Sequence, residues 1–291
     1  GYPFYAIGGA VSEGYTIPFK GTFDGQGYQV DHATITSNNK DCVGFFGNLQ
    51  GATVKNLILG EHCKVSGGKN RVAGIAGMIS GDSGQRTTIT NCWNKAAIEG
   101  TSFVGGIVGF VFVTGQGAAL SDGKIQTAGG ATAAAKVTTH YISNCTNTGK
   151  VTASGRDVGG ILGNSQSLLE VTNCRNAGEI TAQGGAAAQG AGGIAGRVSA
   201  NPAVISGCIN NGKVYAKECT VAGIAGNVVV SGTTIENCGN YGKITTVAGK
   251  TPKAIYGSSN NVSVQSRANK GTTEQAEDKT LEKALEADGA I

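Results

Sequence analysis

Short apolar segments that end in glycine recur along the whole chain and alternate with polar turns. Their pattern is Val-Gly-Gly-Ile-Val-Gly or a close variant, and the last glycine of the seven copies lies at positions 47, 77, 109, 163, 196, 226 and 257. The intervals are therefore 30, 32, 54, 33, 30 and 31 residues. Such short runs, broken by glycine, favour strands over helices. A nearly constant period predicts a repeat protein in which each copy forms one structural turn.

A second segment recurs between these copies and combines an apolar residue with Asn-Cys-x-Asn and a following glycine. Its clearest copies begin at Ile89, Ile142, Val171, Ile205 and Ile235. Short strands of this kind can bury their apolar residues if each pairs with the coils above and below it, at a spacing of about 4.8 Å. We therefore expect an all-β fold, a right-handed parallel β-helix (solenoid) of about eight coils, with a C-terminal helix.

Stacking of equivalent residues predicts three columns of side chains inside this solenoid. The apolar column is Val30, Val54, Ile89, Ile142, Val171, Ile205, Ile235 and Val264; the cysteine column is Ala33, Leu57, Cys92, Cys145, Cys174, Cys208 and Cys238; the asparagine column is Asn94, Asn147, Asn176, Asn210, Asn240 and Asn269. The first two columns are three residues apart, so a bend must separate them. Parallel cysteines suit free thiols better than disulfides. Stacked asparagine amides can hydrogen-bond along their column.

These segments resemble the GLUG-motif repeat, as seen in VGGIVG at 104–109 and VGGILG at 158–163. GTFDGQGYQV at 21–30 is similar to the opening of such repeat regions in Bacteroidetes surface proteins. The resemblance covers about 19–271. It implies an extracellular or outer-surface setting, because these repeats occur in adhesin-like proteins and beside peptidase domains of the immunoglobulin-A-cleaving type. It carries over no catalytic residue.

The departures from the repeat divide the chain into three parts. Residues 1–18 are expected to form an N-terminal cap, and 19–271 the repeat region with an inserted loop at about 112–138. The tail at 272–291 is acidic, and Thr272 with Gln275 fits a capping box at the start of a helix. This helix is expected to cover the open end of the solenoid, where strand edges would otherwise stay unpaired.

Composition excludes several classes of partner. Aromatic residues make up 6% of the chain against 40% for all hydrophobic residues, which predicts a core of small and β-branched side chains. The net charge of +4 is spread without a dense Lys/Arg run, so we expect no nucleic-acid partner. No apolar run reaches the length of a membrane span. We expect a monomer or weak oligomer.

The residues that usually carry catalysis or bind metals are scattered. Asp24, Asp41, Asp82, Asp122 and Asp157 stand in separate turns without an Asp-x-Asp pair. His32 is aligned with Asn56 and Asn91, which favours a structural role, and His62 beside Cys63 lacks the spacing of a zinc site. The sequence therefore predicts no catalytic residue, no metal and no cofactor, and a chain that is not an enzyme.

Exposed aromatic and basic residues are the candidates for binding. Trp93 and Arg175 are expected to point outward from neighbouring parts of one face, where they could stack on a sugar ring or contact a protein. Phe112, His140 and Tyr141 flank the insertion and could form a recognition loop. The favoured hypothesis is a secreted or surface adhesin-like scaffold that binds a glycan or host protein. A carbohydrate-active enzyme and a passive stalk remain the alternatives.

Overall fold

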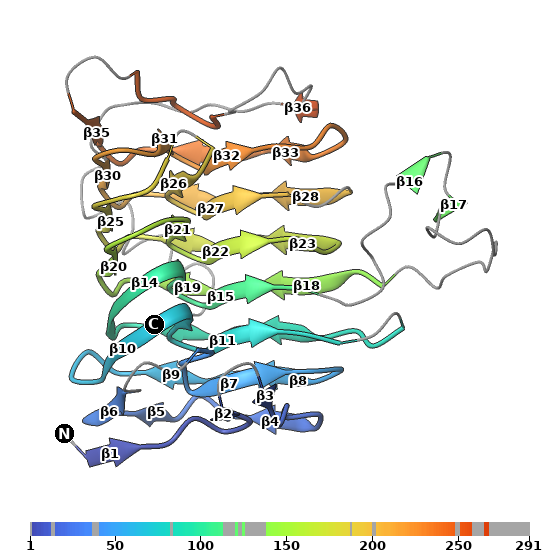
Figure 1. Cartoon of the computed structure of the whole chain (residues 1–291), viewed down its shortest axis with the longest axis vertical. Coiled ribbons are helices and arrows are strands. Elements are labelled where there is room, and N and C mark those ends of the chain that lie inside the picture. The colour runs from blue at the N-terminus through green and yellow to red at the C-terminus, as the bar shows by residue number, and fades with distance from the viewer. Residues whose placement is uncertain are drawn as a thin grey trace.

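The chain winds into a parallel β-solenoid, seen in the computed structural model as a vertical stack of flat turns (Figure 1). The structure describes residues 2–12, 15–36, 41–81, 84–112, 120–121, 124–125, 138–186, 188–199, 202–247, 251–257 and 265–267. Within them the secondary structure is entirely β, which confirms the predicted fold class. About six turns are complete, with partial turns at the two ends, in place of the eight expected. The predicted helix at 272–291 lies outside the described residues.

Four stacks of parallel strands form the walls. The glycine sheet contains β7 (Phe46–Leu49), β11 (Ala76–Ile79), β15 (Val108–Val111), β22 (Leu162–Ser165), β27 (Ala195–Val198) and β32 (Ala225–Val228). The isoleucine sheet contains β4 (Thr22–Asp24), β8 (Thr53–Lys55), β12 (Thr88–Thr90), β18 (His140–Ser143), β23 (Leu169–Thr172), β28 (Ala203–Ser206), β33 (Thr234–Glu236) and β36 (Gln265–Arg267). Both sheets place every strand beside its equivalent in the next turn, as the repeat predicts.

The two remaining walls complete each turn. The asparagine sheet contains β5 (Gln29–Val30), β9 (Ile58–Leu59), β13 (Trp93–Asn94), β19 (Thr146–Asn147), β24 (Arg175–Asn176), β29 (Ile209–Asn210) and β34 (Gly239–Asn240). The long sheet contains β1 (Tyr2–Phe4), β6 (Ala33–Thr36), β10 (Lys64–Ala73), β14 (Ala97–Gly105), β20 (Val151–Ala153), β21 (Val158–Gly159), β25 (Ile180–Ala182), β26 (Gly190–Gly192), β30 (Val214–Ala216), β31 (Thr220–Ala222) and β35 (Ile244–Thr246). Two antiparallel pairs stand apart from these walls, β2 (Ala10–Ser12) with β3 (Tyr15–Thr16) and β16 (Leu120–Ser121) with β17 (Lys124–Ile125).

The apolar column forms in the isoleucine sheet, but its first member differs from the prediction. Val54, Ile89, Ile142, Val171, Ile205 and Ile235 are successive register partners, and all are buried. Below Val54 lies Phe23, whereas Val30 pairs with Leu59 in the asparagine sheet. The reason is a longer turn, because Gln29 follows Phe23 by six positions while Ile58 follows Val54 by four. At the other end Ser266 is the partner of Ile235, and Val264 lies outside the described residues.

The cysteine column is a stack of buried free thiols, as predicted. All eight cysteines of the chain are free, and the five of the column at positions 92, 145, 174, 208 and 238 are at most 2% exposed. Each of these Sγ atoms donates to the carbonyl two residues earlier, at 3.2 to 3.4 Å. Burial raises the pKa of the Cys174 thiol, which keeps it protonated and unreactive. Ala33 is not in this column, because it lies on β6 in the long sheet.

The asparagine column forms one continuous chain of amide hydrogen bonds from Asn94 to Asn240. Each Nδ2 donates to the Oδ1 of the next asparagine at 2.7 to 2.8 Å and to the carbonyl two residues later in its own turn at 2.9 to 3.0 Å. The five side chains are fully buried, so these bonds satisfy groups that would be costly to desolvate alone. Asn269 lies outside the described residues. The structure thus confirms the predicted column over five members.

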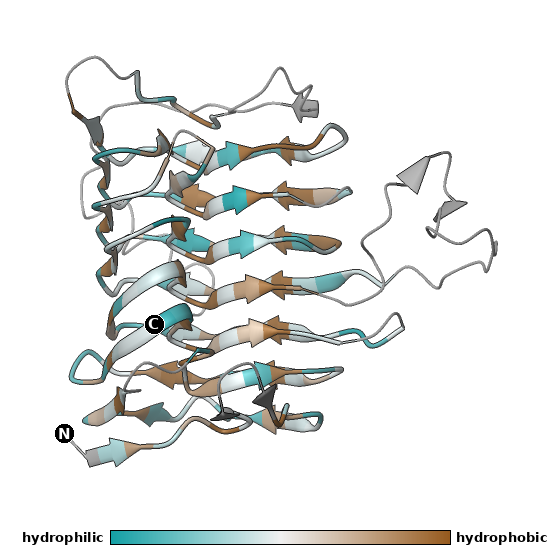
Figure 2. Cartoon of the chain, viewed as in Figure 1, coloured by the Kyte–Doolittle hydropathy of each residue, from teal (hydrophilic) through white to brown (hydrophobic). Residues whose placement is uncertain are grey.

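Glycine two residues after four of the five asparagines keeps neighbouring turns close together, and Ala96 takes this place after Asn94. A Cβ placed on Gly178 would lie 1.9 Å from the carbonyl oxygen of Gly149 in the previous turn. A Cβ placed on Gly149, Gly212 or Gly242 would likewise lie 1.9 to 2.1 Å from a carbonyl oxygen of the previous turn. Figure 2 shows that apolar residues recur on the strands of every turn, which matches the buried core of Val, Ile, Leu, Ala and Cys. At the first turns the core also contains a cluster of phenylalanines, including Phe23, Phe45 and Phe46.

Candidate functional site

A groove follows the bend between the isoleucine and asparagine sheets. We call it the bend groove; it has a volume of about 880 Å³ and is lined by Asp24, Gln26, Gly27, Asn56, Ile58, Asn91, Cys92, Trp93, Asn144, Thr146, Asn173, Arg175 and Gly207. These residues come from six successive turns, so the groove runs along the solenoid axis. The bend predicted from the spacing of the first two columns is thus also the wall of this cavity.

One residue per turn makes the bend by adopting the left-handed backbone conformation. Asn56, Asn91, Asn144 and Asn173 have φ between 52° and 56°, and Gly207 occupies the same place with φ of 64°. Asparagine and glycine are the residues that tolerate this conformation best. The fold therefore presents a polar amide at nearly every turn of the groove. The Asn-Cys pair of the repeat was visible in the sequence, but its exposure in a groove depends on the bend geometry.

The lower end of the groove is held by a carboxylate. Asp24 Oδ1 accepts a hydrogen bond from Asn56 Nδ2 at 2.9 Å, and Lys55 Nζ lies 3.0 Å from Asp24 Oδ2. Asn91 Nδ2 in turn donates to Asn56 Oδ1 at 3.4 Å. The Asn56 amide, followed by the Gln26 backbone amide and Lys55, lowers the pKa of Asp24 to about 2. The carboxylate is therefore charged at neutral pH and aligns the first two amides.

Trp93 and Arg175 lie in the same groove, two turns apart in the outward column of the asparagine sheet. Trp93 pairs with Thr146, and Thr146 pairs with Arg175. The indole Nε1 donates to Thr148 Oγ1 at 3.1 Å, and Lys95 Nζ lies 4.1 Å from the ring centroid. The indole is half-buried and is held in one orientation by these two contacts. An aromatic ring and a guanidinium thus line the groove beside the stacked amides.

The other three candidates lie outside the bend groove. His140 is fully buried on β18, where Nδ1 accepts a hydrogen bond from the Thr87 backbone at 3.1 Å. Burial lowers the pKa of His140 to about 4, so it is neutral at physiological pH. The Arg86 guanidinium lies over the Tyr141 ring, with its Cζ 4.9 Å from the ring centroid, and the Phe112 ring stacks on Phe110. The structure therefore separates a buried histidine from the two aromatics near the insertion, most of which lies outside the described residues.

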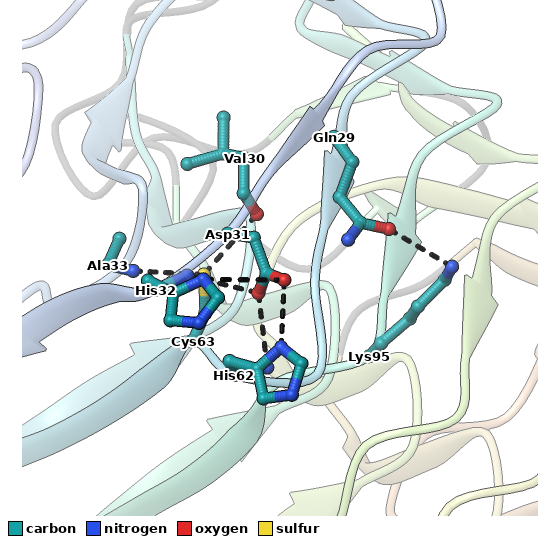
Figure 3. A network of polar contacts seen from close by, with 8 residues as sticks. All are labelled: Gln29, Val30, Asp31, His32, Ala33, His62, Cys63 and Lys95. Atoms are coloured by element: carbon teal, nitrogen blue, oxygen red, sulfur yellow. Dashed lines mark hydrogen bonds and ion pairs between the residues drawn. The ribbon is translucent and has the colours of Figure 1, made fainter. Parts of the chain in front are cut away.

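A cluster of Asp31, His32 and His62, which we call the histidine corner, brings together possible metal ligands (Figure 3). Asp31 Oδ2 lies 2.9 Å from His62 Nδ1 and 3.7 Å from His32 Nδ1. The two imidazole rings stack with centroids 4.7 Å apart. His32 does not align with Asn56 as the sequence suggested, because the longer first turn moves it to the corner between the asparagine and long sheets. Sequence reasoning missed this cluster since its ligands come from two turns.

Comparison with known proteins supports the fold more strongly than the family. No family model matches the chain. A curated relative named Halomucin, from Haloquadratum walsbyi, is 32% identical over 91 residues, which are 31% of this chain and 1% of that protein. The chain thus spans a very small part of the relative's length. In the described part of the chain, no helix is long and apolar enough to cross a membrane.

A solved structure shares the fold over most of the chain. It is the crystal structure of a putative immunoglobulin A1 protease from Bacteroides ovatus, with a TM-score of 0.59 and 19% identity, and the match covers 91% of this chain and 71% of the other. The prediction that this chain is not an enzyme is contradicted by this neighbour, because the same solenoid occurs in a protein that carries a protease name. The absence of a catalytic motif therefore does not separate this fold from enzymes. What the likeness establishes is a β-solenoid similar to that of the Bacteroides ovatus protein.

Proposed function

We propose that this chain is a secreted or surface-displayed, adhesin-like scaffold that binds an extended glycan along the bend groove. The observation that carries the proposal is the gathering of stacked asparagines, Trp93 and Arg175 in one groove parallel to the solenoid axis. The similarity to Halomucin and to the Bacteroides ovatus protein supports an extracellular setting.

The spacing of the groove suits a polymer of sugars. Consecutive turns lie about 4.8 Å apart, which is close to the length of one pyranose residue in an extended glycan. Asn91, Asn144 and Asn173 therefore offer one amide per sugar, and an amide both donates to and accepts from sugar hydroxyls. Trp93 supplies an apolar face for a ring, and Arg175 a charged donor for an acidic substituent.

The residues that line the groove also support binding as the proposed role. Hydrolysis of a glycan by a pair of carboxylates requires two such groups on opposite sides of the bond. Among the described residues that line the groove, Asp24 is the one carboxylate, and it is bound to Asn56 and Lys55. A passive stalk would not need a polar groove with an oriented indole. Glycan binding therefore accounts for more of the observed surface than either alternative.

A glycan array with three variants tests this function. Trp93→Ala removes the aromatic face, and Asn144→Gly removes one amide while glycine keeps the left-handed backbone, as Gly207 does at the same place. We expect each change to weaken the strongest array signals by about tenfold, the loss that follows when a central contact of about 1.4 kcal/mol is removed.

The matched control is Tyr215→Ala. Tyr215 is also half-buried, but it lies on β30 in the long sheet, away from the groove. It should leave the array signals unchanged, and melting curves should confirm that all three variants remain folded. Binding that survives in Trp93→Ala and Asn144→Gly, or falls equally in Tyr215→Ala, would remove the bend groove from consideration.

A further inference from the structure

The Asp31 carboxylate is fixed by the backbone before any ligand arrives. Oδ1 accepts hydrogen bonds from the backbone amides of His32 at 3.0 Å and His62 at 3.1 Å. These bonds join two successive turns and direct Oδ2 toward both imidazoles. A carboxylate with one oxygen held by amides and the other facing two histidine nitrogens has the arrangement of an oriented metal ligand.

The three ligand atoms are near the separation that a small metal ion needs. One ligand atom from each residue lies within 4.8 Å of the others. Zinc bonds of about 2.0–2.2 Å in a tetrahedron require ligand atoms about 3.4 Å apart, between the 2.9 Å and 3.7 Å observed from Asp31 Oδ2 to the two Nδ1 atoms. The His32 and His62 side chains are 64% and 56% exposed, so each ring can turn its nitrogen toward an ion.

We propose that the histidine corner binds a divalent transition-metal ion of the zinc class through Asp31, His32 and His62. Imidazole and carboxylate ligands suit zinc, nickel, copper and iron, and are poor for magnesium and calcium when two of three ligands are nitrogen. Binding requires a lone pair on the nitrogen that faces the ion, so the Nδ1 proton that His62 donates to Asp31 moves to Nε2 in the neutral ring, or to solvent when the ring starts as the imidazolium. Three protein ligands leave a fourth position that faces solvent and can hold water.

The bound ion would fasten the first turns of the solenoid to each other. Asp31 and His32 follow β5, and His62 follows β9 in the next turn. These turns are among the first of the stack, next to β1 and β6. Any ligand that binds only the folded state stabilises it by mass action. The proposal stands independently of glycan binding in the bend groove.

Histidine NMR provides a direct test, because the chain has three histidines and one of them is an internal reference. The probe is Zn²⁺ titrated into the whole chain at pH 7.5. We expect the ring signals of His32 and His62 to change with saturation at one ion per chain. His140 is buried and accepts from Thr87, so its signals should stay in place. Absence of a change, or an equal change in all three histidines, would overturn the proposal.

Variants distinguish this site from zinc bound elsewhere. His62→Gln and His32→Gln should each weaken Zn²⁺ binding in calorimetry by tenfold or more, since each removes one ligand. Lys64→Gln, two positions away and exposed, should bind zinc as the wild type does. The double variant H32Q/H62Q lacks both histidine ligands, so any Zn²⁺ that it still binds is held elsewhere, for example by the cysteine thiols. Wild-type affinity in this variant would place the ion outside the histidine corner and overturn the proposal.

Discussion

The first two turns and the middle turns of this solenoid are built by the same winding but from different chemistry. From Asn94 to Asn240 each turn repeats an apolar residue, a thiol and an amide at the same three places. In the first two turns those places hold residues such as Phe23, Leu57 and Leu59, and phenylalanines fill the interior. The middle turns are regular and carry the polar asparagine column in their interior. The N-terminal turns are irregular and have apolar residues at the place of that column.

This difference separates the tasks of the two regions. A regular column lets each amide satisfy the next, so the middle turns can be extended without a new solution for every turn. The first turns hold apolar side chains such as Leu59 at the place of the amide, so they bury no polar group there that would need a partner of its own. Because the first turns do not follow the repeat, they can carry residues that occur in no other turn. Asp31, His32 and His62 come together in these turns. The bend groove, in contrast, is a product of the repeat itself.

The largest effect is expected from a charge in the middle column. Val171→Asp places a carboxylate among fully buried neighbours in the isoleucine sheet, Ile142 below and Ile205 above. An unpaired buried charge costs several kcal/mol, enough to unfold the middle turns. Circular dichroism should show lost β signal or a melting temperature lowered by well over ten degrees. Thr172→Asp, at the half-buried neighbour, is the control and should melt close to the wild type.

A second effect should appear when the amide chain is cut. Asn176→Ala removes the donor to Asn210 Oδ1 and the acceptor of Asn147 Nδ2, so two buried groups lose a partner. We expect the free energy of unfolding to fall by about 2–4 kcal/mol. Asn94→Ala should cost less, because Asn94 Oδ1 accepts no hydrogen bond in the described part of the chain. Equal losses in chemical denaturation would show that the column gains nothing from its continuity.

Much of the fold could be predicted from residue identity, because equivalent positions in successive turns carry the same type of residue. The repeated Ile89, Ile142 and Val171 indicate the apolar column, and the parallel stacking of the cysteines explains why their thiols are free. The position of Val30 could not be predicted, since the longer turn after Asp24 shifts the register without changing the pattern of residue types.

The candidate sites were predictable only in part. Trp93 and Arg175 were expected on one face, and they do line the same groove. The histidine corner could not be foreseen, because His62 lies 31 positions after Asp31, in the next turn, and no repeated motif connects them. His140 looked like a loop residue beside the insertion, and only the register of β18 shows that its side chain points into the core.

The first turns and the middle turns shift the pKa of histidine in opposite directions. The Asp31 carboxylate raises the pKa of His62, whereas burial lowers the pKa of His140 to about 4. NMR titration should show His62 above 6.5 and His140 far below it. A neutral buried histidine stabilises the fold fully above pH 6.5, and this contribution is lost as the pH falls toward 4.

The stability consequence can be isolated with one variant. Between pH 6.5 and 5 the His140 contribution should decrease by about 2 kcal/mol. In His140→Gln an amide oxygen can still accept from the Thr87 backbone, but nothing titrates at this place. The unfolding free energy of the wild type should therefore fall more steeply with acid than that of His140→Gln. Parallel pH profiles for the two proteins would contradict the assignment of a buried, neutral imidazole.

The smallest effect is expected where the two regions meet, at Leu59. Its register partner is Asn94, whose Oδ1 is buried without a donor, so the amide column ends one turn above. Leu59→Asn would extend the asparagine column by one turn and donate the hydrogen bond that Asn94 Oδ1 lacks. This bond should raise the free energy of unfolding by about 1 kcal/mol or more. The same change removes a fully buried leucine and its apolar contacts. These terms oppose each other, so the unfolding free energy should change far less than in Leu59→Ala, for which about 2–5 kcal/mol is lost. If Leu59→Asn is as damaging as Leu59→Ala, the boundary is set by apolar packing in the first turns, and the orphaned oxygen of Asn94 is tolerated at little cost.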